Sequence, residues 1–272
     1  MHPKISIITA VYNRAETISR SINSIKQQSY KNVEIVIIDG KSTDGSLELA
    51  KSLLTQNDVI ISEPDNGIYD ALNKGINHSS GDIIGFLHSD DFFINNNILE
   101  KVANIFEINK VDVVYGDAAF FQGNDIESIS RVYKSDNLSL SNLSWGKMPA
   151  HPAIYISKDI YNKIGSFKVD YSIAADYEFL CRMMSNEDIR SIYIQEIFVK
   201  MQLGGISTHG LRSMYLLNKE VLRACRENDI DTNIFMLISK YPSKLFQIIR
   251  KRKFIIMFLG RYIIRFKNWI KR

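Results

Sequence analysis

Cysteine, proline and glycine are all scarce in this 272-residue sequence, which has two cysteines, five prolines and 14 glycines. The two cysteines, Cys181 and Cys225, cannot build a disulfide framework, and no CxxC or Cys/His spacing typical of a zinc site is present. So little glycine and proline excludes collagen-like and linker-rich architectures. The 45% share of hydrophobic residues excludes bulk disorder. We therefore expect a globular protein of a reducing compartment, the cytoplasm.

Long apolar runs and the features of a signal peptide are also missing. The N-terminal stretch MHPKISIITAVYN has no basic start, no long apolar run and no small-residue cleavage site. The longest apolar stretch near the C-terminus, residues 254–259, is far shorter than the roughly 20 residues of a membrane-spanning helix. The sequence therefore predicts a chain that does not cross a membrane.

Acidic residues are absent from the C-terminal end of the chain. Residues 232–272 contain no Asp or Glu but 11 of the 34 Lys and Arg, which leaves 23 basic and 30 acidic groups in residues 1–231. Such an acidic body argues against a nucleic-acid binder. Between residues 254 and 272, apolar side chains recur on one helical face and Lys and Arg lie mostly away from it. This pattern predicts that residues 240–272 bind an anionic membrane surface, with docking on the body or on a second subunit as the alternative.

Apolar, β-branched runs alternate with helical periodicity through the first half of the chain. Continuous Val and Ile runs are typical of strands buried on both faces of a parallel sheet. The expected strands cover residues 5–11, 33–38, 59–62, 83–87 and 111–115. This β-α-β alternation predicts an α/β fold with a mostly parallel sheet flanked by helices. After about residue 120 the alternation is lost, and further helices are expected at residues 159–164, 177–184 and 211–226.

Polar residues follow each of the first four expected strands. They lie at positions 9–14, 39–45, 63–75 and 88–91. Ligands of open α/β sheets bind at the carboxyl ends of the strands, so this convergence indicates a binding site. Two of these residues, Asn13 and Asp44, also fit as N-caps of the helices that follow.

Adjacent carboxylates, Asp90 and Asp91, close the fourth of these segments. They repel each other unless a cation or hydrogen-bond donors compensate, which favours a divalent ion. No GxGxxG follows the first strand and no GxxxxGK[ST] occurs, which argues against a dinucleotide-binding Rossmann domain and a P-loop NTPase.

Six short motifs together resemble the inverting family 2 glycosyltransferases of the GT-A fold, of the bacterial surface-polysaccharide type. They occur in the family's order over about residues 3–210: ISIITAVYNR, VEIVIIDGKSTDGS, EPDNGIYDALNKGI, GDIIGFLHSDD, GSF at 165–167 and AADYEF at 174–179. The resemblance implies a GT-A domain over residues 1–210, with a nucleotide-binding half to about residue 120 and an acceptor half from 121. Residues 211–272 are then expected as a helical, basic extension.

The resemblance further implies a nucleotide-sugar donor, with a UDP-sugar as the first candidate and GDP- and dTDP-sugars left open. A base pocket with Tyr12 near the base and an Asp39 carboxylate suited to uracil N3–H is expected. Relatives often carry Arg where this chain has Leu72, so Lys74 is the expected cation near the diphosphate. The implied donor-binding residues are Thr9, Tyr12, Asn13, Asp39, Asn66, Gly67, Asp70, Asn73, Lys74 and Asp90.

Metal binding and catalysis are implied at separate carboxylates. Asp91 closes the family's DxD-type motif, here Ser-Asp-Asp, and is the expected ligand of Mn²⁺ or Mg²⁺, with His209 as a further candidate. Asp176 matches the catalytic base, which takes the proton of the acceptor hydroxyl as it attacks the anomeric carbon with inversion. Helix capping is the alternative role of Asp176, and Glu178 is the nearest rival carboxylate. His151 is placed on the acceptor side.

The sequence thus predicts a metal-dependent, inverting glycosyltransferase that works peripherally at the inner face of the cell membrane. Its expected acceptor is a glycan or polyprenyl-linked glycan in the synthesis of O-antigen, capsule or exopolysaccharide. A sugar nucleotidyltransferase is one alternative, although TAVYNR lacks the glycine-rich loop usual after the first strand of such enzymes. A non-catalytic, membrane-associated adaptor is another, and the presence of Asp39, Asp91 and Asp176 together argues against it.

Overall fold

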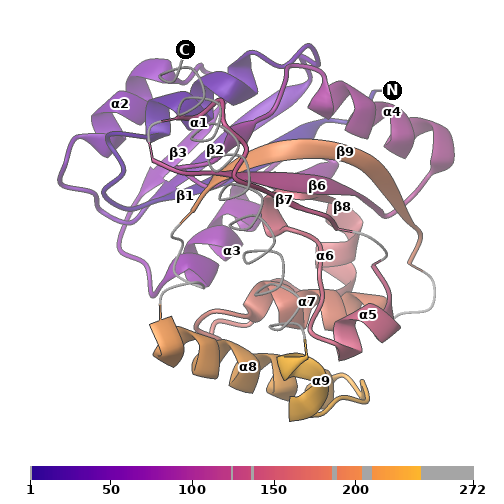
Figure 1. Ribbon diagram of the computed structural model, residues 1–272. Helices are drawn as coiled ribbons and strands as arrows, with labels where there is room; N and C mark the ends of the chain where they lie inside the picture. Colours follow the sequence, from indigo (N-terminus) through magenta and orange to yellow (C-terminus); the bar gives the residue numbers. More distant parts are fainter. Residues whose placement is uncertain (1, 124, 136–137, 186–188, 204–209, 240–272) are drawn as a thin grey trace, which may run out of the picture.

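A nine-stranded mixed sheet forms the centre of the computed structural model (Figure 1). The structure describes all residues except 1, 124, 136–137, 186–188, 204–209 and 240–272. The strands run in the order β3-β2-β1-β4-β8-β6-β9-β5, with β7 beside β6. Their bounds are β1 Ile5–Val11, β2 Val33–Asp39, β3 Val59–Ser62, β4 Ile83–Phe86, β5 Phe92–Phe93, β6 Val113–Phe121, β7 Arg131–Tyr133, β8 Ile154–Ser157 and β9 Ser191–Gln202.

The first four strands in this order, β3, β2, β1 and β4, run parallel to one another. β1 pairs with β2 from Ile5↔Val33 to Val11↔Asp39, and on its other side it pairs with β4. The chain therefore proceeds from β1 outward in one direction and then returns to the opposite side of β1. The carboxyl ends of β1 and β4 lie at this reversal, which is where open α/β sheets bind their ligands.

Helices cover both faces of the sheet, because alternate side chains of each strand point to opposite sides. Ile7 of β1 belongs to a core cluster with residues of α1, α2 and α4, whereas Ile8 belongs to a second cluster with residues of α3, α6, α7 and α8. The helices are α1 Ile18–Lys26, α2 Ser46–Leu53, α3 Ile68–His78, α4 Ile98–Asn109, α5 Leu140–Ser144, α6 Lys158–Ile164, α7 Ala175–Met184, α8 Gly210–Glu227 and α9 Ile234–Ile238, with a 3-10 turn, η1, at His151–Ala153.

The predicted α/β architecture is confirmed, with two local differences. The strand expected at 111–115 runs instead from Val113 to Phe121 and includes the buried Asp117, whose Oδ1 accepts hydrogen bonds from Ser135 N and Tyr193 Oη, both at 2.8 Å. The prediction that Asn13 caps the first helix was wrong. α1 begins five residues later, with Thr17 at its N-cap.

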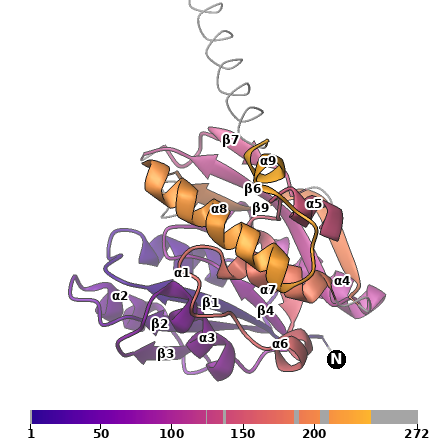
Figure 2. The ribbon, with the colours of Figure 1, turned by 90° about the horizontal axis from the view of Figure 1, so that it is seen from below.

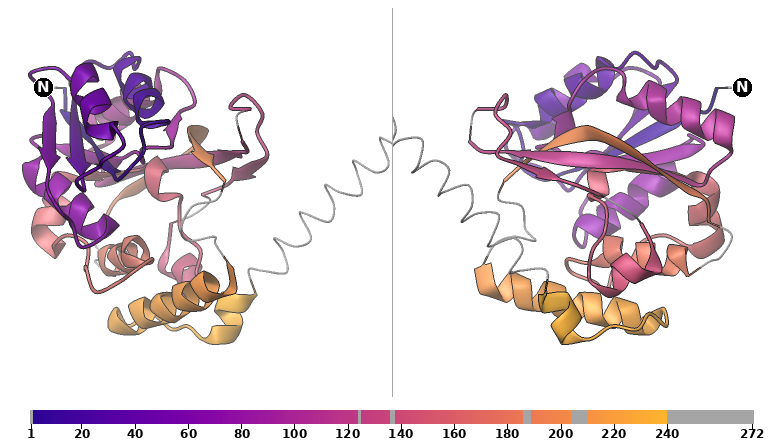
Figure 3. Two further views of the ribbon diagram at one scale, coloured as in Figure 1. Left: turned by 90° about the vertical axis from the view of Figure 1, so that its left-hand side faces the viewer. Right: turned by 45° about the vertical axis from the view of Figure 1, so that its right-hand side comes forward.

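The helix α8, expected at 211–226, packs on α7 as an outer layer together with α9 (Figures 2 and 3). Its side chains Val221, Ala224 and Cys225 are buried in the same core cluster as α3, α6 and α7. In the part of the chain that the structure describes, no helix is both long and apolar enough to span a bilayer. The predicted membrane-binding segment, 240–272, lies outside the described residues.

Candidate active site

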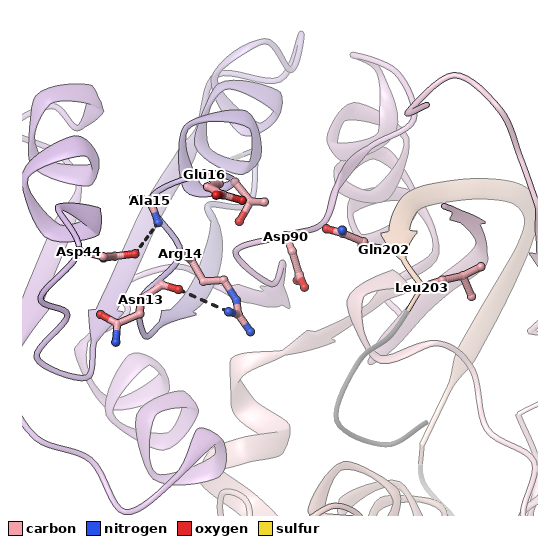
Figure 4. Close-up of a pocket in the computed structure, with 9 residues that line it drawn as sticks. Asn13, Arg14, Ala15, Glu16, Asp44, Asp90, Gln202 and Leu203 are labelled. Carbon is pink, nitrogen blue, oxygen red and sulfur yellow. Dashed lines mark hydrogen bonds between the residues drawn. The ribbon is translucent and has the colours of Figure 1, made fainter. Parts of the chain in front are cut away.

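The polar ends of β1, β2 and β4 meet at one edge of the sheet, as predicted. A cavity of about 390 Å³ opens there between the loop after β1, the loop after β4 and the end of β9 (Figure 4). The side chains of Arg14 and Asp90 point into it from facing loops. Its lining residues are Asn13, Arg14, Ala15, Glu16, Thr17, Asp44, Asp90, Gln202 and Leu203.

The loops after β1 and β2 are joined by hydrogen bonds between them. Asn13 has a φ of 52°, and its Oδ1 accepts a hydrogen bond from Thr43 N at 2.9 Å. Asp44 accepts one from Ala15 N and one from Ser46 N, both at 3.0 Å, while Gly45 is the N-cap residue of α2. The N-cap prediction for Asp44 was therefore wrong as well. Asn13 and Asp44 thereby hold the two loops together at the edge of the sheet where the nucleotide-sugar donor is expected to bind.

The expected base pocket combines one exposed ring with two enclosed side chains. Tyr12 is 64% exposed, and its ring lies beside Gly40, where an added Cβ would be 3.5 Å from Tyr12 Cδ2 and would overlap Asp65 Oδ2. Thr9 and Asp39 are fully buried beneath this surface. Contact of either with a base therefore requires a local rearrangement.

The Asp39 carboxylate already accepts two sets of hydrogen bonds within the chain. Its oxygens accept from Ser42 N at 3.1 and 3.3 Å, and Oδ2 accepts from the Ser62 hydroxyl at 2.6 Å. Movement of the segment that carries Ser42 would leave Asp39 free to bind the base of a nucleotide-sugar donor. Its base-binding role stays a prediction.

The loop before α3 holds several predicted donor residues in contacts with one another. Gly67, with a φ of 112°, is the N-cap residue of α3, and Asp70 Oδ2 accepts a hydrogen bond from Asn66 N at 2.9 Å. Lys74 Nζ lies 2.8 Å from Glu63 Oε1 and 3.5 Å from Asp70 Oδ2. Contact of Lys74 with a diphosphate would require it to exchange these carboxylates for phosphate.

Asn73 connects α3 to the GSF motif instead of facing open space. Its Nδ2 donates to Phe167 O at 2.8 Å, and its Oδ1 accepts from Phe167 N at 2.9 Å. Both polar ends of the amide are thus occupied by one backbone residue. A contact between Asn73 and the donor stays a prediction that would cost these two bonds.

Asp91 is the carboxylate that best fits a cation. It is 3% exposed, and its Oδ2 has no hydrogen-bond partner among the described residues. Burial first, and the nearby Asp90 second, hold the pKa of Asp91 well above its usual range, while Arg20 acts in the opposite direction. An orphaned carboxylate oxygen in a buried place is costly unless a cation or a donor completes it.

The described residues contain no cluster of three or more His, Cys, Asp or Glu that would hold an ion by itself. Mg²⁺ is commonly bound by one or two carboxylates together with substrate phosphates, so a single strong protein ligand is compatible with such a site. The further candidate ligand, His209, lies outside the described residues.

Asp176 lies in the first turn of α7, one residue after its start, and the N-cap residue is Ala174. The capping alternative was therefore wrong. Asp176 Oδ1 accepts a hydrogen bond from Tyr177 N at 2.9 Å and lies 3.1 Å from Tyr69 Oη. Burial raises the pKa of Asp176 to about 6. A carboxylate with a pKa this close to neutral is suited to general-base catalysis.

The rival carboxylate, Glu178, faces away from Asp176, as expected from the turn of the helix. It is fully buried, with Arg182 Nη2 at 3.0 Å from Oε2 and Lys168 Nζ at 2.9 Å from Oε1. Both carboxylate oxygens of Glu178 are thus occupied by cations and do not face the surroundings of Asp176.

Four aromatic rings connect the metal-side loop to the surroundings of Asp176. The ring centroids of His88 and His151 are 5.8 Å apart, those of His151 and Phe167 are 5.7 Å apart, and those of Phe167 and Tyr69 are 5.8 Å apart. Burial lowers the pKa of His151 to about 3, so this ring is neutral at physiological pH. Its Nε2 is buried and has no partner among the described residues. The acceptor-side role of His151 stays a prediction.

Sequence reasoning missed four residues of this region. Arg14 and Arg20 both lie near the acidic pair: the first lines the cavity, and the second donates from Nη2 to Asp90 O at 3.1 Å. Tyr69 contacts Asp176, and Glu220 of α8 accepts hydrogen bonds from three consecutive backbone N–H groups just before α7. Arg14 and Tyr69 lie inside quoted motifs and were open to prediction, whereas a glutamate in an amphipathic helix carries no such signal.

Comparison with known proteins identifies related sequences. A family model described as Glycosyl transferase family 2 matches residues 6–165, more than half of the chain. The chain is 32% identical over 183 residues to an uncharacterized glycosyltransferase of Mycobacterium tuberculosis, covering 66% of this chain and 68% of the relative. It is 29% identical over 210 residues to a PGL/p-HBAD biosynthesis glycosyltransferase of Mycobacterium bovis, covering 75% of this chain and 79% of the relative.

Solved structures show a similar fold. S. aureus TarS 1-349 in complex with UDP-GlcNAc has a TM-score of 0.65 and 18% identity, covering 84% of this chain and 68% of that one. The mannosyltransferase PcManGT from Pyrobaculum calidifontis, in complex with GDP-Man and Mn²⁺, has a TM-score of 0.61 and 16% identity, covering 86% and 66%. The architecture is that of GT-A glycosyltransferases, and the family model shows that the chain belongs to glycosyl transferase family 2.

Proposed function

We propose that this glycosyltransferase moves a sugar from a nucleotide-sugar donor, a UDP-sugar first, to an acceptor hydroxyl with inversion at the anomeric carbon. The observation that carries the proposal is the buried Asp91 carboxylate with an unpartnered oxygen at the carboxyl end of β4, beside the cavity that Arg14 and Asp90 line. The Arg14 cation and the Asp90 and Asp91 carboxylates at this edge suit a diphosphate that is bound together with a divalent cation.

In the proposed reaction, Asp176 takes the proton from the acceptor hydroxyl. The freed oxygen forms a bond to the anomeric carbon from the side opposite the diphosphate, and the bond from that carbon to the phosphate oxygen breaks. The nucleoside diphosphate leaves with the bonding electron pair. A divalent ion, Mn²⁺ or Mg²⁺, would be held by Asp91 and would offset the negative charge of the leaving group. The proton ends on Asp176, whose raised pKa favours its retention there.

The donor class is proposed from both the site and the neighbours. TarS 1-349 is solved in complex with UDP-GlcNAc, and PcManGT is solved in complex with GDP-Man and Mn²⁺. The exposed Tyr12 ring beside Gly40 offers a face on which a base can stack. We place uracil there first because the Asp39 carboxylate beneath it suits the N3–H group, provided that the Ser42 segment releases it.

The acceptor is proposed to be a glycan or a polyprenyl-linked glycan in bacterial surface-polysaccharide synthesis, at the inner face of the cell membrane. The relative named as a PGL/p-HBAD biosynthesis glycosyltransferase supports a biosynthetic role for the sugar transfer. Residues 240–272 are proposed to bind the anionic bilayer. Support comes from α9, directly before this segment, which exposes Phe235 at 82%, Ile238 at 48% and Ile234 at 42%.

The test is thermal stabilisation of the full chain by UDP, GDP, dTDP, CDP and ATP, each with and without Mn²⁺. A ligand that binds only the folded state raises the melting temperature. We expect one nucleoside diphosphate to stabilise the wild type in a Mn²⁺-dependent manner, and Asp91→Ala to abolish the effect. Asp231→Ala removes an exposed carboxylate and should retain it. Absence of stabilisation by all five nucleotides, with the chain folded, would overturn the donor-site proposal.

The stereochemical part of the proposal has its own measurement. The anomeric configuration of the product, read by proton NMR against that of the donor, is expected to be inverted. Retention of the donor configuration would contradict the direct displacement assigned to Asp176.

A further inference from the structure

The hydroxyl of Tyr69 lies within hydrogen-bond distance of two acceptors at once. Tyr69 is on α3 and is 8% exposed. Its Oη is 2.5 Å from the carbonyl oxygen of Ile173 and 3.1 Å from Oδ1 of Asp176. A phenol carries one proton, so it donates to one acceptor at a time, but its oxygen also accepts.

The protonation state of Asp176 decides how this proton is shared. When Asp176 is ionised, its oxygens only accept, so a hydrogen bond between the two groups requires the Tyr69 proton to point at Asp176. When Asp176 is protonated, it can donate to Tyr69 Oη, and the Tyr69 proton then satisfies the Ile173 carbonyl. The 2.5 Å separation from Ile173 O fits the second arrangement, and in the first arrangement the Tyr69 oxygen must move away from that carbonyl and toward Asp176.

The second acceptor is itself fixed by a separate helix. Glu220 of α8 accepts hydrogen bonds from Ile173 N and Ala174 N at 2.9 Å each, both on Oε2, and from Ser172 N at 2.8 Å on Oε1. These bonds hold the segment that carries the Ile173 carbonyl in place. The site around Asp176 is therefore built from α3, α7 and α8 together.

We propose that Tyr69 is the positioning residue of the catalytic base: its single proton turns from Asp176 to the Ile173 carbonyl as Asp176 takes up the acceptor proton. The inference rests on the proposed role of Asp176 as the base. Tyr69 thereby keeps the carboxyl group in one orientation before and after proton transfer, with a small shift of its own hydroxyl between the two acceptors. Tyr69 is not a catalytic residue, because the buried ring acts through Asp176.

Among the described residues, three ionisable groups on neighbouring elements interact with Asp176. Tyr69 donates a hydrogen bond from α3, and Glu220 on α8 disfavours a second negative charge. Tyr133 on β7 is influenced by the charge of Asp176, while its own hydroxyl donates to Met148 O at 2.7 Å. Removal of the Tyr69 hydroxyl withdraws the side-chain donor to Asp176 and leaves the other two groups in place.

The experiment compares Tyr69→Phe with Tyr161→Phe in the full chain. Tyr161 lies in the same core cluster, and its buried hydroxyl has no hydrogen-bond partner among the described residues. For Tyr69→Phe we expect the acid limb of the pH profile of kcat to move up by about one pH unit, since a lost hydrogen bond to the charged form raises its pKa. The smaller ionised fraction lowers kcat at pH 7 about twofold, and the lost positioning contact should bring the total fall to at least fivefold, while KM for the donor stays within twofold. Tyr161→Phe should change none of these.

Two further measurements separate the outcomes. Carboxyl carbon-13 NMR titration, with the Asp176 signal identified by its loss in Asp176→Asn, should show the same upward shift in Tyr69→Phe without any turnover. An unchanged titration and an unchanged acid limb in a folded Tyr69→Phe would overturn the positioning role even if Asp176→Asn is inactive. Full activity of Asp176→Asn would instead overturn the base assignment, and with it this inference.

Discussion

Replacing Asp176 by Asn should stabilise the protein and remove its activity, with a pH dependence that separates the two effects. Asn has nearly the same shape, and its Oδ1 can still accept the hydrogen bonds of Tyr177 N and Tyr69 Oη. The substitution mainly removes a charge that burial disfavours. Because burial raises the pKa of Asp176 from 3.8 to about 6, the ionised group costs the folded state at most about 3 kcal/mol.

The sign of this cost follows from proton binding. Between pH 3.8 and about 6, the folded chain holds the Asp176 proton more tightly than the unfolded chain does, so the stability of the wild type falls as the pH rises. The difference in unfolding free energy between Asp176→Asn and the wild type should therefore grow over this window. It should reach a plateau of at most about 3 kcal/mol above pH 7. A gain of this size corresponds to up to about 6 °C in melting temperature.

Urea unfolding of both chains at pH 4, 5, 6, 7 and 8 measures this difference directly. Donor turnover, followed as release of nucleoside diphosphate, should fall by at least a hundredfold in Asp176→Asn, the usual range for a lost general base. A constant stability difference across the pH series would show that the carboxyl is not desolvated in the folded chain. Turnover equal to that of the wild type would show that another group takes the acceptor proton.

Three other substitutions test the surrounding architecture. Gly40→Ala should raise the Kd for the nucleoside diphosphate at least fivefold in calorimetry with little loss of stability, because the new methyl displaces the flexible Asp65 side chain at the base surface. Arg14→Ala should also weaken that binding about tenfold, because a cation facing Asp90 is removed from the cavity. The effect of the substitution should be smaller at high salt, where charges are screened. An effect that does not change with salt would refute this explanation. Glu220→Gln should lower the unfolding free energy by about 1.5–3 kcal/mol through weaker bonds to three N–H groups, and should move the acid limb of kcat downward because a repelling charge is lost.

The sheet and its ligand-binding edge were predictable because each depends on local sequence. A continuous apolar run such as 33–38 has few alternatives to a buried strand, and β2 occupies Val33–Asp39. Because parallel strands end at the same edge, the position of Asp39 and Asp91 at strand ends brought them to one edge without further information. The length of β6 was not predictable, since a buried Asp117 needs two partners from distant segments.

The roles of individual polar residues at that edge were harder to predict, because one side chain fits several roles. Asn13 is a good helix cap by type, yet its amide bonds to Thr43, 30 residues along the chain. Asn73 has the chemistry of a ligand-binding residue, yet both of its polar atoms bond to the backbone of Phe167, 94 residues away. Residue type and motif position specify that such a group is polar and near the site, and only tertiary packing selects its partner.

The residues that position Asp176 extend beyond the part of the sequence that contains the quoted motifs. The last quoted motif ends at residue 179 and the resemblance at about residue 210, but the segment that precedes Asp176 is held by Glu220 of α8. Without that carboxylate, three backbone N–H groups at the positive end of the α7 dipole would lose their acceptor. The apolar face of α8, with Val221 and Ala224, packs in the same core cluster as α7 and so fixes the position of Glu220. The geometry of the proposed base therefore depends on packing from α8, a helix in which no residue matches a family motif.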